Sequence, residues 1–309
     1  PASMDAQVNI VSVTSEDCGQ ENGAIDAEEV LVGSPMISSW LWSNGATTAN
    51  LENVPAGDYT LEFTDFDGCT SYLAATIPST KPYQPQICLL TVDTSNTYNM
   101  IIWEKDAFNV VDGWNLYRET TVYGEFELVA TIPYTDDAMY IDNAASPMAR
   151  SWHYYITSFN SCGESYGSFI HKTIHTVSFA DTLITGALKV VWDDYEGINY
   201  TSIDLLKHTD ALGWFVLTTI TTGNEYVDVD AGLDLVGINY MVEFNLASPC
   251  NPGKAIDHNS SRSNKASSIF IGGGETGLSI IENKAGEILM YPNPTSSDLT
   301  IYIENFDKF

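Results

Sequence analysis

Ile101-Ile102-Trp103-Glu104 and Val190-Val191-Trp192-Asp193 decide the fold, because they occupy the same position in two copies of one module. Trp103 and Trp192 are separated by an offset of 192 − 103 = 89. The same offset joins four more pairs: Leu116 to Leu205, Arg118 to Lys207, Thr120 to Thr209 and Phe126 to Phe215. Further along, an offset of 86 joins Tyr140 to Tyr226, Asp142 to Asp228, Tyr154 to Tyr240 and Ile156 to Val242. A repeat of about 90 residues is much longer than a solenoid unit, so it predicts two tandem domains, residues 80–179 and 180–268.

Each copy has the pattern of short antiparallel strands. Trp152, Tyr154 and Ile156 alternate with their neighbours at the period of two that is typical of a half-buried strand. Further strands are expected around Trp103, over residues 114–120 and over residues 126–131, with a corner at residues 140–142. Several short strands at this spacing predict a sandwich of two sheets.

The first quarter of the chain has the same character. Tyr59, Leu61 and Phe63 alternate along one strand, and Asn44-Gly45 is a tight-turn signal. We therefore expect an all-β protein with three tandem immunoglobulin-like sandwich modules, the first at residues 5–79. A glycine-rich linker is expected at residues 269–287.

The repeated modules resemble fibronectin type III domains, through an early inward Trp, a Tyr-Arg strand and a late aromatic-x-Tyr-x-aliphatic strand. They resemble more closely the tandem type III modules of Bacteroidota surface proteins, through phrases such as Asn160-Ser161-Cys162-Gly163-Glu164-Ser165. The first module resembles the short repeat of gliding-motility adhesins. Its matching motifs are Trp42-Ser43-Asn44-Gly45, the Pro55–Tyr59 strand start and an Asp-x-x-Gly-Cys end at Cys69.

Charge narrows the possible partners. The chain has 41 acidic and 12 basic residues, a net charge of −29. Such a surface repels nucleic acid backbones and anionic lipids, so we expect neither as a partner. No apolar run approaches the roughly 20 residues of a membrane-spanning helix. Solubility outside the cell explains the acidity, and calcium binding is the open alternative.

Five widely spaced cysteines in a strand-rich chain favour disulfides and an oxidising compartment. Cys18 and Cys69 lie at the ends of the first module, so we expect them to pair. The resemblance to type III modules implies a second pair, Cys88 with Cys162, because the first strand and the last hairpin meet at one pole. Cys250 is then the odd cysteine.

Other candidate sites are weak. His171 and His175 have zinc-protease spacing, but on a strand they are about 13 Å apart, too far for one metal. Asp228, Asp230 and Asp234 resemble part of a calcium loop, although Ala231 replaces the acid or amide expected before its glycine. Exposed tryptophans could stack on sugars, and the candidates are Trp40, Trp42 and Trp214.

The tail at residues 288–309 resembles the opening of a type IX secretion sorting domain. The motif comprises Tyr291, Pro292, Asn293 and Pro294, followed by Leu299 and Ile301. The prolines hold the chain extended, and Leu299, Ile301 and Ile303 alternate along a strand. The sequence stops at Phe309, before the remaining strands that such a domain needs.

These features predict a non-enzymatic, secreted or cell-surface protein: a stalk, spacer or adhesin segment exported by the type IX secretion machinery. No cofactor is expected, and no nucleophile–base pair stands out. Two alternatives stay open: an accessory region of a larger secreted enzyme, and a carbohydrate-binding module. A protein or polysaccharide ligand is possible in either case.

Overall fold

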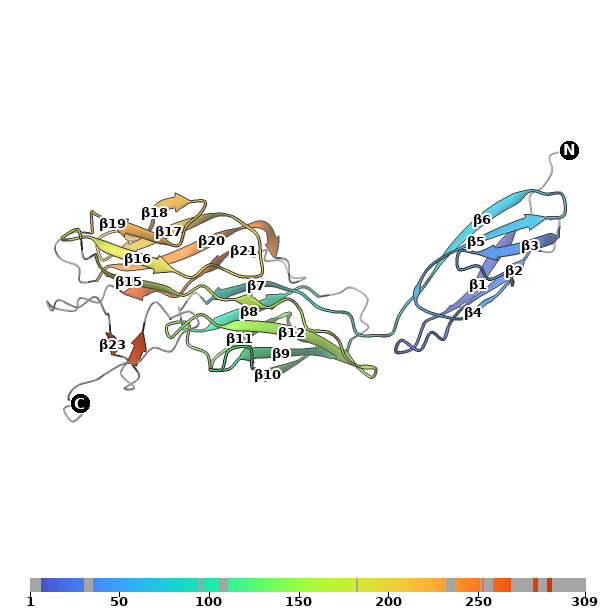
Figure 1. The fold of residues 1–309 in the computed structure, drawn as a ribbon, viewed down its shortest axis with the longest axis horizontal. Helices are drawn as coiled ribbons and strands as arrows, with labels where there is room; N and C mark the ends of the chain where they lie inside the picture. The colour runs from blue at the N-terminus through green and yellow to red at the C-terminus, as the bar shows by residue number, and fades with distance from the viewer. Residues whose placement is uncertain are drawn as a thin grey trace.

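The computed structural model describes residues 7–30, 36–93, 95, 97–105, 111–181, 183–231, 237–250, 252, 258–267, 280–282 and 288–290. These residues form strands and no helix, as the sequence predicts. The strands build three sandwich modules, followed by a short two-stranded sheet (Figure 1).

The first module packs two three-stranded sheets face to face. The strand order is β1-β2-β4 in one sheet and β3-β5-β6 in the other. Alternating apolar residues of β5 face the core, where Leu61 and Trp42 are buried. The strands are β1 (Val8–Thr14), β2 (Gly23–Glu29), β3 (Ile37–Trp42), β4 (Leu51–Val54), β5 (Gly57–Asp65) and β6 (Thr70–Ile77).

The second module pairs a three-stranded sheet, β11-β8-β7, with a larger sheet, β10-β9-β12-β13, to which β14 adds beside β12. Trp103 on β8 and Trp114 on β9 meet edge to face in the core, with ring centroids 5.5 Å apart. The strands are β7 (Ile87–Val92), β8 (Asn99–Trp103), β9 (Gly113–Glu119), β10 (Phe126–Pro133), β11 (Met139–Asp142), β12 (His153–Asn160), β13 (Gly163–Glu164) and β14 (His171–Lys172).

The third module repeats this order strand for strand. Its sheets are β15-β16-β19 and β18-β17-β20-β21, with β22 beside β20. Even the bulge in the hairpin is repeated, between Leu128 and Ala130 in the second module and between Leu205 and Leu206 in the third. The strands are β15 (Thr176–Ala180), β16 (Leu188–Trp192), β17 (Tyr200–Thr209), β18 (Gly213–Ile220), β19 (Glu225–Asp228), β20 (Asn239–Cys250), β21 (His258–Arg262) and β22 (Ala266–Ser267).

The second and third modules lie side by side (Figure 1). The contact joins β7 and β21, each of which is an edge strand of its own sheet. An exposed edge strand presents unpaired backbone groups, so each module shields an edge of the other. The first module lies apart at the end of the molecule, joined through the segment that follows β6 (Figure 1).

Part of the predicted linker is ordered as a strand. Residues 269–287 include β23 (Ile280–Glu282), which pairs antiparallel with β24 (Ile288–Met290) at the start of the predicted sorting segment. The β-branched pair Ile280-Ile281 favours a strand. The prediction of a linker rested on the nearby glycines and did not take this pair into account. The sorting residues Tyr291, Pro292, Asn293, Pro294, Leu299 and Ile301 lie outside the described residues.

Candidate functional site at the module junctions

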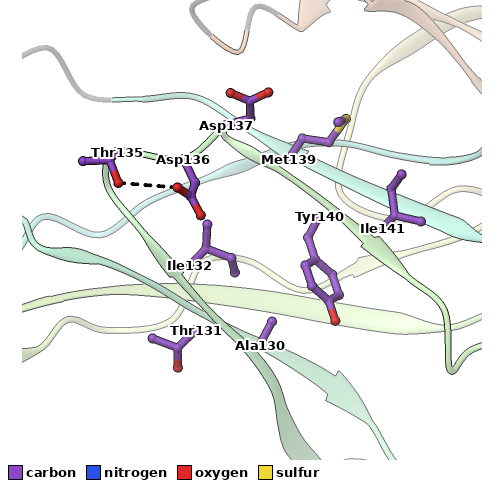
Figure 2. Close-up of a pocket in the computed structure, with 9 residues that line it drawn as sticks. All are labelled: Ala130, Thr131, Ile132, Thr135, Asp136, Asp137, Met139, Tyr140 and Ile141. Atoms are coloured by element: carbon purple, nitrogen blue, oxygen red, sulfur yellow. Dashed lines mark hydrogen bonds between the residues drawn. The ribbon is translucent and has the colours of Figure 1, made fainter.

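A shallow groove lies between two edge strands of the second module, β10 and β11 (Figure 2). Ile132 and Tyr140 line it, and Asp136 and Asp137 line it from the turn between β10 and β11. Its nine lining residues offer carboxylates and hydroxyls, but no histidine, cysteine or lysine. The groove therefore places carboxylates and hydroxyls together, with no basic side chain in its lining.

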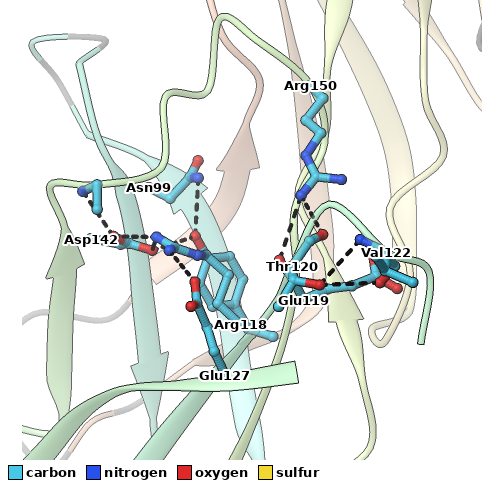
Figure 3. Close-up of polar contacts among 10 residues, drawn as sticks. Asn99, Arg118, Glu119, Thr120, Val122, Glu127, Asp142 and Arg150 are labelled. Carbon is cyan, nitrogen blue, oxygen red and sulfur yellow. Dashed lines mark hydrogen bonds and ion pairs between the residues drawn. The ribbon is translucent and has the colours of Figure 1, made fainter. Parts of the chain in front are cut away.

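A buried ion pair ties the two sheets of the second module together (Figure 3). Arg118 on β9 donates to Asp142 on β11 at 2.9 Å, and the Tyr154 hydroxyl donates to the same carboxylate at 2.9 Å. Burial is the main reason that the pKa of Tyr154 lies well above its usual value, and the Asp142 charge raises it further. The tyrosine hydroxyl therefore stays protonated and donates to Asp142. Arg118 also lies over the Trp152 ring, and Arg150 lies 4.1 Å from the centroid of that ring.

The third module carries the same triad at the repeat positions. Lys207 Nζ is 2.6 Å from Asp228 Oδ2, and the Tyr240 hydroxyl donates to that oxygen at 2.6 Å. Asp228 is 3% exposed and Lys207 is 7% exposed, so the pair is removed from solvent. Lys207 and Tyr240 belong to one sheet of the third module and Asp228 to the other, so these contacts connect the two sheets.

This triad gives the Asp228 carboxylate structural partners, and calcium binding at this loop stays a prediction. The carboxylate is buried, and its Oδ2 already binds an ammonium group. Asp230 is exposed and its backbone N–H donates to Asp228, whereas Asp234 lies outside the described residues. The spacing of the three acids raised the calcium hypothesis, whereas the repeat, which matches Asp228 with Asp142, favoured a structural corner at this position.

The tryptophans proposed as a sugar platform occupy different environments. Trp42 is 1% exposed and belongs to the first module's core, so it cannot stack on a ligand. Trp40 packs partly against the same core and approaches Phe63. Trp214 is 40% exposed beside His208 on the outer face of the third module. Trp40 and Trp42 lie two residues apart on β3 and both contact the first module's core, whereas Trp214 belongs to the third module, so the three rings do not form one platform.

The junction between the first and second modules is narrow and covalent. Cys18, after β1, forms a disulfide with Cys162 in the β12–β13 turn, with Cα atoms 5.1 Å apart. Thr80 bridges the two sides: its Oγ1 accepts from the Cys18 N–H at 2.9 Å, and its carbonyl accepts from Asn160 at 2.7 Å. Nearby, Glu16 is buried and accepts from the Ser79 hydroxyl.

The junction between the second and third modules is broad and apolar. Cys88 on β7 forms a disulfide with Cys250 at the end of β20, with Cα atoms 5.4 Å apart. Leu89 and Ile102 of the second module are fully buried against Cys250 and Leu246 of the third. Fully burying a leucine-sized side chain contributes about 1.5–3 kcal/mol, so the two leucine-sized anchors make this a stable contact.

Polar groups at the same junction bond across it. The Leu90 N–H donates to the Tyr195 hydroxyl at 2.7 Å, and that hydroxyl is 3.2 Å from Nδ1 of His171. Burial lowers the pKa of His171 to about 4, which keeps the ring neutral near pH 7. The Ser261 hydroxyl donates to the Leu90 carbonyl, and Thr91 Oγ1 accepts from the Arg262 N–H at 3.0 Å. Each module therefore satisfies buried backbone groups of the other.

The segment between β14 and β15 is buried, unlike an ordinary linker. Thr173, Ile174 and His175 are 2%, 1% and 4% exposed. Burial also lowers the pKa of His175, whose Nδ1 is 3.0 Å from the Pro147 carbonyl. His171 lies on β14 and His175 lies in the segment after it, and the two rings contact different partners, Tyr195 and Pro147.

Both predicted disulfides are wrong, and the structure gives the reason. Cys18 pairs with Cys162 instead of Cys69, and Cys88 pairs with Cys250 instead of Cys162. The predictions assumed that each disulfide closes one module. Instead, the third module folds back beside the second and brings Cys250 to β7, while the β12–β13 turn of the second module faces the first. Cys69 is in neither disulfide.

Sequence reasoning also missed the junction residues Leu90, Tyr195 and Ser261. One signal was present: the polar run Asn259–Asn264 occupies a strand position, yet Ser261 and Ser263 are fully buried. Buried hydroxyls on a strand indicate partners outside the module's own apolar core.

No family model and no curated protein match this chain. Among solved structures, it is similar to the FN1–FN3 domains of chicken CNTN1, with 10% identity, a TM-score of 0.36, and coverage of 84% of this chain and 97% of that chain. It is also similar to the fibronectin type III domain of human fibronectin type III domain containing protein 3. That match has 18% identity and a TM-score of 0.23, and it covers 29% of this chain and 83% of that chain. The sandwich assignment rests on the strand order and register of the chain itself.

Proposed function

We propose that this chain is a non-enzymatic segment of an extracellular or cell-surface protein that holds its modules in a fixed arrangement, as a stalk, spacer or adhesin segment. The observation that carries the proposal is that both disulfides join different modules. A disulfide within a module stabilises only that module's fold, whereas one between modules fixes their relative position. Disulfide-bonded sandwich modules are typical of extracellular proteins.

Two further observations support a scaffold. The buried polar triads at Asp142 and Asp228 each join the two sheets of their module, which suits a structural role. The net charge of −29 suits a protein that must stay dispersed outside the cell. Among the described residues, no helix is long and apolar enough to cross a bilayer.

Export by the type IX secretion system is part of the proposal and rests on the motif at Tyr291–Pro294 with Leu299 and Ile301. The test fuses the native C-terminal region, from residue 269 onward, to a fluorescent reporter in a bacterium that has this system. A matched variant replaces Pro292 and Pro294 by alanine. Reporter in the medium or on the surface for the native fusion, and retention for the variant, is the expected result. Retention of both fusions inside the cell would contradict the export route.

A further inference from the structure

The two disulfides overlap along the chain. The cysteines occur in the order Cys18, Cys88, Cys162 and Cys250, and the first pairs with the third and the second with the fourth. Each disulfide therefore closes a loop that contains one cysteine of the other, with sequence separations of 144 and 162.

We propose that the overlapping disulfides limit how far this chain extends under tension, and that either disulfide alone is sufficient to do so. The biological meaning rests on the proposed function, because a stalk or adhesin segment bears force between its two ends. The mechanical property itself depends only on which cysteines are joined.

The limit follows from the shortest covalent path between Cys18 and Cys250. Without disulfides, the path follows the backbone all the way from one cysteine to the other. With both disulfides, it follows the backbone only from Cys18 to Cys88 and then crosses directly to Cys250. At roughly 3.4 Å per extended residue, the maximum span falls from about 790 Å to about 240 Å.

The second disulfide provides a parallel route of similar length. From Cys18 the path crosses to Cys162 and follows the backbone to Cys250, a span of about 300 Å at the same rise per residue. Loss of Cys88–Cys250 therefore lengthens the limit by only about 60 Å, and loss of Cys18–Cys162 does not lengthen it at all. Two disulfides placed one after another inside separate modules would lack this redundancy.

The fold directs force toward these routes. β1 ends at Thr14 and precedes Cys18, so tension on the N-terminal side first peels β1 from β2. Once β1 is free, the Cys18–Cys162 disulfide passes load directly into the β12–β13 turn of the second module. While the second module stays folded, this route bypasses β2 to β6. At the limit of extension the backbone from Cys18 to Cys88, which contains β2 to β6, becomes taut and bears the load.

The test is single-molecule force spectroscopy with handles at the two ends of the chain. Every protein carries Cys69→Ser, which prevents thiol exchange. The variants are Cys18→Ser with Cys162→Ser, Cys88→Ser with Cys250→Ser, and all four substitutions together. Segments outside Cys18–Cys250 contribute equally to each variant. The protein with both disulfides intact is also measured before and after reduction with dithiothreitol. This gives the same comparison without substituting Cys18, Cys88, Cys162 or Cys250, in case a variant fails to fold.

The expected maximum extensions are equal for the wild-type pairings and the Cys18/Cys162 variant. The Cys88/Cys250 variant is expected to be about 60 Å longer, and the fourfold variant about 550 Å longer, at roughly 3.4 Å per residue. A wild-type extension that matches the fourfold variant would overturn the proposal, as would a large gain from removing one disulfide. The reporter fusion described above tests export independently. A negative result in one experiment therefore does not change the interpretation of the other.

Discussion

Replacing Asp228 by alanine is expected to cost about 3–5 kcal/mol of unfolding free energy. The substitution leaves the Lys207 ammonium group, 7% exposed, without the carboxylate that lies 2.6 Å away. It also removes the acceptor of the Tyr240 hydroxyl. Breaking a buried ion pair from one side costs about 3–5 kcal/mol because a charge is left uncompensated, whereas replacing both partners by apolar residues is close to neutral.

Urea denaturation followed by tryptophan fluorescence measures this cost. The matched variant carries Lys207→Met together with Asp228→Leu, and we expect it to stay within about 2 kcal/mol of the wild type. Because the second and third modules share a junction core, the tryptophans of both modules should report one transition. If Asp228→Ala lowers the free energy of unfolding by less than about 1 kcal/mol, this triad is not a stabilising buried connection between the two sheets.

Three further predictions concern the junction between the second and third modules. Tyr195→Phe removes the acceptor of the buried Leu90 N–H and should cost about 1–3 kcal/mol in the same urea assay, with no loss refuting the contact. Gly197→Ala should destabilise the protein by at least about 2 kcal/mol, because φ is +112° and a Cβ would lie 2.4 Å from the His171 ring; unchanged thermal unfolding would argue against this packing. His171 has its pKa lowered to about 4 in the folded state, so the unfolded chain, which titrates near pH 6.5, binds more protons between these values. Stability should therefore fall by up to about 3 kcal/mol as pH drops from about 6.5 to about 4, and His171→Gln should flatten this dependence; an equal slope in both proteins would contradict it.

The sequence was sufficient for the architecture of the repeated modules. The offsets of 89 and 86 matched Trp103 with Trp192 and Asp142 with Asp228, and the structure places each pair at equivalent positions of equivalent strands. Such pairs are visible because core positions constrain residue type locally. The one local misreading, Tyr140–Asp142 as a corner, falls on a four-residue edge strand, β11. A strand that short carries too few alternations to be distinguished from a turn.

The arrangement of the modules could not be predicted in the same way. Whether the third module extends from the second or folds back depends on contacts between β7, the first strand of the second module, and β21, near the end of the third. Neither strand has a periodicity that identifies its partner. The cysteine pairing follows from that arrangement, so assigning one disulfide to each module failed for both.

Disulfide mapping distinguishes pairing between modules from pairing within a module. The protein is alkylated without reduction, digested, and analysed by mass spectrometry for cross-linked peptides. If both disulfides join different modules, the digest contains peptides that join Cys18 to Cys162 and Cys88 to Cys250, with alkylated Cys69. Peptides that join Cys18 to Cys69, or Cys88 to Cys162, would show that each disulfide closes a single module and would contradict both the fixed arrangement and the limit on extension.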